Sequence, residues 1–157
     1  MRTIRRRRLE AKTDYKTRLA LLKSGIPRFV VRKTNTSVIA QVIIATQGQD
    51  KIVAGASSSL LLTKGWPEAL RGSLKSLPAA YLTGHMVGKA ALKHTKKAIL
   101  DIGMQRNIHK SRLYALVAGA IDAGLVIPCD KEALPSKEHI TKNTKLQKAF
   151  EAVKGKL

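Results

Sequence analysis

The sequence has one cysteine, few aromatic or acidic residues and no long hydrophobic run. A single cysteine, Cys129, excludes an internal disulfide and fits a reducing compartment, so the cytosol is the default location. The longest apolar region, residues 113–127, is interrupted by Asp122 and falls short of the roughly 18 uncharged residues that suggest a membrane-spanning helix. No apolar block follows the basic N-terminus, and neither end carries a lipidation motif. We therefore expect no membrane partner.

The shortage of carboxylates argues against a metal-dependent nuclease, which gathers several of them around its ions. Only Asp101 and Asp122 fall in segments with a clear secondary-structure pattern. We expect Asp101 to bond to neighbouring backbone or arginine, and Asp122 to be solvated or paired. The four histidines show no metal-ligand spacing, and the chain has no phosphate-binding loop or dinucleotide motif. We expect no catalysis, no metal and no cofactor.

Positive charge is abundant, with 30 Lys and Arg against 10 Asp and Glu and a net charge of +20. Such a charge opposes compaction unless a partner supplies counter-charge, which indicates a polyanion. Two Phe, three Tyr and one Trp leave few rings for a base-stacking platform. The composition therefore favours recognition of the backbone and shape of a folded nucleic acid.

The densest charge lies at the N-terminus, where residues 1–18 hold eight basic and two acidic residues. The stretch IRRRRLEAKTDYKTR is rich in arginine, which makes bidentate contacts with phosphate. We predict a helix over residues 9–24, ended by Gly25. Residues 1–24 are thus predicted to be a basic arm that leads into a helix. Residues 1–12 are expected to be mobile in the free protein and to order on the partner; the alternative is a solvated helix without a partner.

Residues 25–129 are predicted to form the main domain, and residues 130–157 a tail with a helix around 145–153 and a minor share of the core. Strands are predicted over 28–33, 38–45 and 51–57, joined by short turns at TNTS and TQGQD into an antiparallel meander. In the first strand Phe29 and Val31 share a core face. Arg28, Val30 and Arg32 share the other face, which is expected to be open to a ligand.

A short helix is possible at residues 68–74. Helices are predicted over 78–97 and from Ser111, its cap, to Gly124, with a buried strand at 98–102 between them. Lys89, Lys93, Lys96 and Lys97 are placed in the last turns of the first helix, and Gly84 and Gly88 are expected to let it lie close on the sheet. The predicted fold class is α/β. It has a mixed sheet, made of a three-stranded antiparallel meander plus one parallel strand reached by a helical crossover, with helices on one face and a basic N-terminal arm.

Several blocks of the sequence resemble one family in the same order. AKTDYKTRLALLKSGIPRFVVRKTNTSVIAQVI, PAAYLTGHMVGKAAL and AILDIGMQRNIHKSRLYALVAGAIDAGLVIP are similar to the 5S-rRNA-binding proteins of the large ribosomal subunit, universal family eighteen, in its archaeal form. The resemblance covers roughly residues 5–129. It implies a mixed α/β protein without catalysis that binds 5S rRNA in the central protuberance. Its implied partners are 5S rRNA, large-subunit rRNA and neighbouring ribosomal proteins, including another 5S-binding protein.

The resemblance also implies which residues bind RNA, in three groups: the basic arm, the first hairpin, and the loop before the last clear helix. These residues are Arg5, Arg6, Arg7, Arg8, Lys12, Tyr15 and Arg18; Arg28, Arg32, Lys33, Asn35 and Gln41; and Arg106, Lys110, Ser111 and Arg112. Two other functions remain open. A general nucleic-acid chaperone or DNA-compacting protein would bind by charge alone, and a nucleic-acid-processing enzyme would require metal and Asp101.

Overall fold

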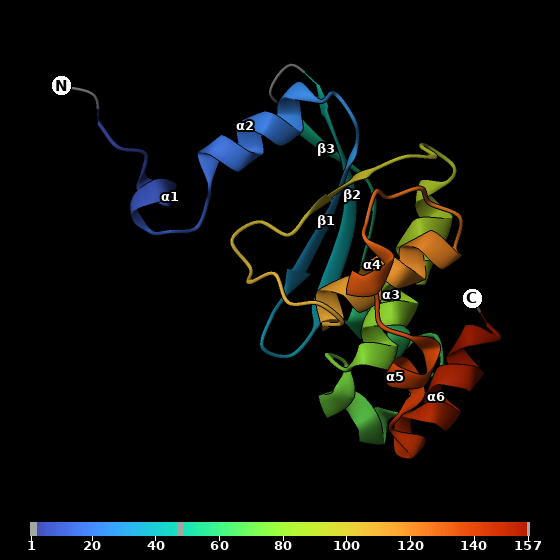
Figure 1. The fold of residues 1–157 in the computed structure, drawn as a ribbon. Coiled ribbons are helices and arrows are strands. Elements are labelled where there is room, and N and C mark those ends of the chain that lie inside the picture. Colours follow the sequence, from blue (N-terminus) through green and yellow to red (C-terminus); the bar gives the residue numbers. More distant parts are fainter. Residues whose placement is uncertain (1–2, 47–48, 157) are drawn as a thin grey trace.

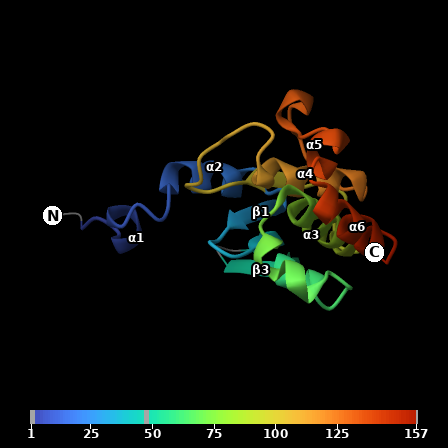
Figure 2. The same ribbon diagram turned by 90° about the horizontal axis from the view of Figure 1, so that it is seen from below.

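The fold is built on a four-stranded mixed sheet, seen in a computed structural model that describes residues 3–46 and 49–156 (Figures 1 and 2). The strands are β1 (Arg28–Lys33), β2 (Val38–Thr46), β3 (Gln49–Ser57) and β4 (Ile99–Asp101), in the order β3-β2-β1-β4. β2 is antiparallel to both β1 and β3, and β4 is parallel to β1. The predicted fold class is therefore confirmed. The second predicted turn includes residues 47 and 48, which lie outside the described residues.

One face of the sheet forms the main core with helices α3 (Leu77–Ala91) and α4 (Arg112–Asp122). Phe29 and Val31 are fully buried there, as the alternation along β1 predicts. Gly124, just after α4, has a φ of +106°, a conformation that favours glycine and ends the helix where expected.

Helices α3 and α4 pack against each other through glycine. A Cβ atom at Gly84 would overlap the backbone of Leu116, and one at Gly119 would overlap the carbonyl oxygen of Tyr81. The expectation that Gly84 and Gly88 face the sheet is therefore wrong, because both lie against α4. Glycine allows the two backbones to approach closely, which fixes the positions of both helix N-termini.

Replacing Gly119 by alanine is expected to destabilise the protein by a net of about 1–2 kcal/mol, because overpacking forces the helices apart. The higher helix propensity of alanine, worth about 1 kcal/mol, acts in the opposite direction, so a net loss identifies the steric cause. Chemical denaturation measures it. The control is Gly72→Ala, where nothing lies within 4 Å of the added Cβ. Equal stability of the two variants would contradict close packing.

Helix α3 is shorter than predicted, because it ends at Ala91 rather than at residue 97. The hydroxyl of Thr95 donates to the carbonyl of Lys97 at 2.8 Å, a local bond that competes with helix. Val126 then pairs with residues 96–98 through two backbone hydrogen bonds. Lys93, Lys96 and Lys97 therefore lie beyond the helix, not in its last turns.

The N-terminal segment forms two helices instead of the single one predicted over residues 9–24. They are α1 (Arg6–Leu9) and α2 (Tyr15–Lys23), and the backbone of Ala11 between them has a φ of +49°. Asp14 starts α2 by accepting hydrogen bonds from the backbone N–H groups of Lys16 and Thr17. Helix α1 lies at the opposite end of the molecule from the C-terminal helices (Figure 2).

The tail contributes much more to the core than predicted. Its elements are the short helices η3 (Lys131–Ala133) and α5 (Lys137–Thr141), and α6 (Thr144–Lys154). Leu146, Ala149, Phe150 and Val153 form one buried face of α6. They pack with Leu82 of α3, and with Leu61 and Leu74 from the segment that carries η1 (Ser58–Leu61) and η2 (Glu68–Ser73), into a second apolar cluster.

Candidate nucleic-acid interface

The arginines of the arm are exposed and only loosely held. Arg6 pairs with Glu10 at 3.0 Å, but the Arg6 side chain is 87% exposed. Arg5 lies over the ring of Tyr15, 4.8 Å from its centroid, and Arg7 donates to the hydroxyl of Thr13 at 2.9 Å. Exposed contacts of this kind contribute little stability, so phosphates can replace them readily.

The second face of the sheet is less open than predicted. Arg28 and Val30 are buried, at 3% and 7% exposure. The Arg28 guanidinium donates to Asp101 at 3.0 Å and to Asp50 at 2.7 Å. The expectation that this face is open to a ligand is wrong at Arg28 and Val30. At Arg28 the reason is that carboxylates from β3 and β4 enclose the guanidinium. Arg28 therefore has almost no surface left for a phosphate.

Asp101 connects the sheet to the loop that follows β4. Besides Arg28, it accepts hydrogen bonds from Arg32 Nη2 at 3.1 Å and from the backbone N–H of Gly103 at 2.9 Å. Its carbonyl oxygen accepts a further bond from Arg32 Nη1 at 2.8 Å. Asp101 therefore bonds to arginine and backbone, as predicted, and it fixes the start of the loop 103–110.

Asp50 connects α2 to the sheet through Arg18 Nη2 at 2.8 Å. Burial raises the pKa of Asp50, but the hydrogen bond and charge of Arg28, followed by those of Arg18, outweigh it and hold the pKa below 3.8. The carboxylate is therefore charged at neutral pH and restrains the orientation of α2 relative to β1.

A small hollow of about 130 Å³ lies where the arm, the sheet and the loop meet. Arg7, Lys12, Arg18 and Arg32 line it, together with Gly103 and Met104 of the loop. Tertiary structure thus brings together arm and hairpin residues that the sequence analysis placed in separate groups. Of the other hairpin residues, Lys33 and Asn35 are exposed near the β1–β2 turn, and Gln41 is half-buried in β2 beside Val30.

A larger hollow of about 910 Å³ lies at the other end of the same loop, and we call it the helix-terminal hollow. The end of β1, at Lys33, and the starts of α3 and α4 meet in its lining. The lining includes Lys33, Arg106, Lys110, Ser111 and Arg112, which are five of the predicted RNA-binding residues.

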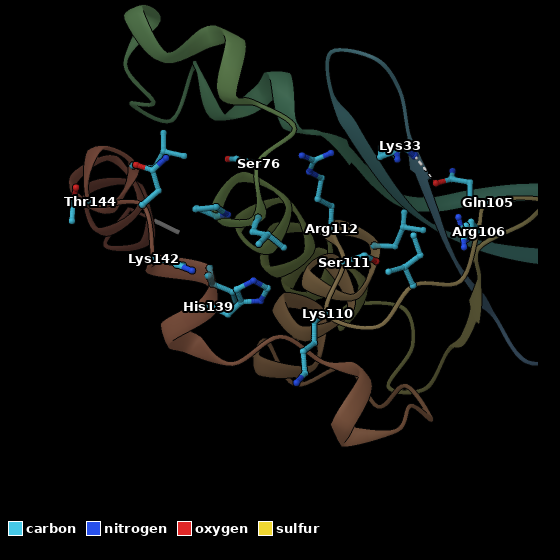
Figure 3. Close-up of a pocket in the computed structure, with 17 residues that line it drawn as sticks. Lys33, Ser76, Gln105, Arg106, Lys110, Ser111, Arg112, His139, Lys142 and Thr144 are labelled. Carbon is cyan, nitrogen blue, oxygen red and sulfur yellow. Dashed lines mark hydrogen bonds between the residues drawn. The ribbon is translucent and has the colours of Figure 1, made fainter.

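Six further polar residues of the helix-terminal hollow were missed by the sequence analysis: Ser76, Gln105, His139, Lys142, Asn143 and Thr144. Figure 3 shows Lys142 and Thr144 at one end of the lining, Lys33 and Gln105 at the other, and Arg112 between them. Ser76 stands shortly before Pro78, a pattern typical of the start of a helix. The sequence could therefore have indicated that Ser76 lies at a helix N-terminus. Nothing in the local sequence relates His139 or Lys142 to this site.

Ser76 and Ser111 stand immediately before α3 and α4. Ser111 has the predicted capping position, but neither serine makes a side-chain cap bond. Both hydroxyl oxygens are buried, and neither has a hydrogen-bond partner within the described structure. A buried polar group without a partner costs about 1–3 kcal/mol, so a ligand that bonds to it recovers that cost.

The electrostatics of the helix-terminal hollow are uniformly positive. None of the described residues that line it is acidic, and its lysines and arginines make no ion pair within the described part of the chain. The N-termini of α3 and α4 add the positive ends of two helix dipoles. This arrangement suits an anion.

The remaining carboxylate in a clear element, Asp122, accepts a hydrogen bond from the Tyr81 hydroxyl at 2.5 Å and is therefore paired. Burial first, and then Asp122, raise the pKa of Tyr81. The described residues contain no cluster of three or more His, Cys, Asp or Glu suited to a metal ion. In the same residues, no helix combines the length and hydropathy needed to cross a membrane.

Comparisons with known proteins find ribosomal proteins. The family described as "Ribosomal large subunit proteins 60S L5, and 50S L18" matches residues 1–98. The chain is similar to three archaeal proteins named "Large ribosomal subunit protein uL18". It is 47% identical to that of Caldivirga maquilingensis over 137 residues, 47% to that of Korarchaeum cryptofilum over 136, and 43% to that of Methanoculleus marisnigri over 136.

Each alignment covers 86% of this chain, so the relatives match beyond the part that the family model covers. The chain spans 64% of the length of the Caldivirga protein, 68% of the Korarchaeum protein and 75% of the Methanoculleus protein. All of these matches are ribosomal proteins, in agreement with the expectation of a non-enzymatic protein.

Proposed function

Because this chain belongs to the family of large-subunit ribosomal proteins L5 and L18, we propose that it is a structural constituent of the large ribosomal subunit that binds 5S rRNA. It helps to attach that RNA to large-subunit rRNA in the central protuberance. Its protein partners are neighbouring ribosomal proteins, including another 5S-binding protein, and its location is the ribosome in the cytoplasm.

The observation that carries the proposal is the continuity of the basic surface. The loop 103–110 lines the small hollow through Gly103 and Met104. It lines the helix-terminal hollow through Gln105, Arg106, Ile108 and Lys110. Cations of the arm, of β1 and of α4 therefore follow one path across the molecule. A long basic path of this kind supports an extended footprint on a folded RNA.

The alternative is a general chaperone that binds by charge alone. Arg112 at the first turn of α4 and Arg32 on β1 stand on backbone that the core fixes, so the points from which the two side chains extend have a fixed spacing. Groups held on rigid elements recognise one shape better than another. Selectivity between RNAs therefore separates the two functions.

The test compares 5S rRNA with an unrelated folded RNA of equal length. Replacing Arg106 and Arg112 by alanine is expected to weaken 5S rRNA binding at least about tenfold, because charge-assisted hydrogen bonds are lost. The unrelated RNA should lose less affinity. Binding titrations at one salt concentration measure both.

The matched control is Lys145→Ala with Lys148→Ala, which removes two exposed charges from α6. This control should weaken both RNAs to a similar, small extent. If the Arg106 and Arg112 variant loses affinity equally for the two RNAs, binding by charge alone explains the data and the proposed function loses its support.

A further inference from the structure

We propose that the helix-terminal hollow binds one unpaired nucleotide of the RNA. Its phosphate lies against the N-termini of α3 and α4, and its sugar and base lie against the apolar wall. This inference rests on the proposed function, because it takes RNA as the partner, but it adds a site of defined chemistry. The site lies at the opposite end of the basic path from the arm.

The phosphate is placed by the two helix starts. The first backbone N–H groups of any helix lack partners inside it, and both helices here also lack a side-chain cap. The buried hydroxyls of Ser76 and Ser111 have no partner within the described structure, so each retains a donor proton for an anion. Convergence of two such termini with Arg112 is suited to phosphate.

The sugar and base are placed by the rest of the lining. Leu113, Ile140 and Leu146 give an aliphatic wall, and His139 gives the single aromatic ring among the described lining residues. Histidine is one of the side chains on which unpaired bases stack. A volume of about 910 Å³ lies within the roughly 300–1,000 Å³ typical of sites for small organic ligands and is far larger than a phosphate needs.

The occupant is a nucleotide rather than an acidic peptide because the cations continue beyond the hollow. Lys142 lies at one end of the lining, and Lys33 and Arg106 lie at the other (Figure 3). From there the loop leads to the arginines around the small hollow. An RNA strand, with one charge per nucleotide, fits such a path. A single unpaired nucleotide fits the hollow, whereas a duplex is too wide for it.

The experiment is an NMR titration of the full chain with each of four probes: adenosine 5′-monophosphate, adenosine, inorganic phosphate and a short oligoglutamate. The nucleotide is expected to shift the backbone amide signals of Leu77, Arg112 and Leu113 and to bind more tightly than either of its parts. Ser76→Ala with Ser111→Ala should weaken the nucleotide about tenfold. Lys145→Ala with Lys148→Ala should leave its affinity unchanged.

Each other outcome overturns the inference. Equal binding of phosphate and nucleotide would remove the role of the apolar wall, and tighter binding of oligoglutamate would assign the hollow to a protein partner. Absence of shifts at the two helix starts would also refute it. In that case, selective 5S rRNA binding that still depends on Arg106 and Arg112 would leave the proposed function intact. If the nucleotide binds at the hollow but 5S rRNA selectivity is absent, the proposed function fails instead.

Discussion

Replacing Arg5, Arg6, Arg7 and Arg8 by alanine is expected to flatten the salt dependence of RNA binding by roughly three units of d log K/d log [salt]. Each arginine that meets a phosphate releases counterions, and log affinity falls by about 0.7–0.9 per neutralised phosphate for each unit of log salt. The structure supports full engagement, because these side chains are exposed and their contacts with Tyr15, Glu10 and Thr13 are weak. Binding titrations at several salt concentrations measure the slope.

The arm is expected to contribute affinity without selectivity. Phosphate contacts carry no sequence information, so the variant should weaken 5S rRNA and an unrelated folded RNA alike. The control removes four exposed lysines from the C-terminal segment, Lys131, Lys137, Lys145 and Lys148, at equal cost in net charge. Its slope should change much less. If the two variants have equal slopes, total charge and not the arm determines the salt dependence.

Replacing Asp101 by leucine is expected to lower the free energy of unfolding by about 3–4 kcal/mol. Removing one member of a buried ion pair costs about 3–5 kcal/mol, because its partner stays buried without compensation. The lower part of that range applies because Asp50 still accepts a hydrogen bond from Arg28 at 2.7 Å. Chemical denaturation monitored by circular dichroism measures the loss.

A second substitution tests the cause of that loss. Adding Arg28→Leu to Asp101→Leu removes the buried charge that Asp50 alone compensates only in part, so the double variant should be more stable than the single one. Glu68→Ala is the control, since its ion pair with Arg71 is exposed and contributes at most about 1 kcal/mol. A double variant that is less stable than Asp101→Leu would show that the arginine is held by packing rather than by charge.

Local pattern was a good guide to the elements of this fold. The alternation in residues 28–33 predicted both the strand and its core face, and the apolar spacing from Leu113 to Ile121 predicted α4. The pattern failed where local hydrogen bonds decide helix ends. Asp14 starts a new helix inside the predicted one, and Thr95 with Val126 shortens α3.

The candidate site was predicted only as a set of basic segments. Lys33, Arg106 and Arg112 were identified, but their meeting in one hollow depends on how α3 and α4 pack. His139 and Lys142 were missed because the tail was expected to contribute little to the core. The buried face of α6 places the tail beside the helix starts instead.

The sequence by itself indicated a polyanionic partner and determined the mixed sheet and the position of the densest charge, because charge content and hydrophobic periodicity are local properties. Only the tertiary structure decided which cations stay free. Arg28 is enclosed by Asp101, 73 positions away, whereas Arg112 remains exposed at a helix start. A buried arginine that carboxylates of its own chain enclose has no surface left for a phosphate, and which arginines are enclosed depends on the distant segments that the core brings together.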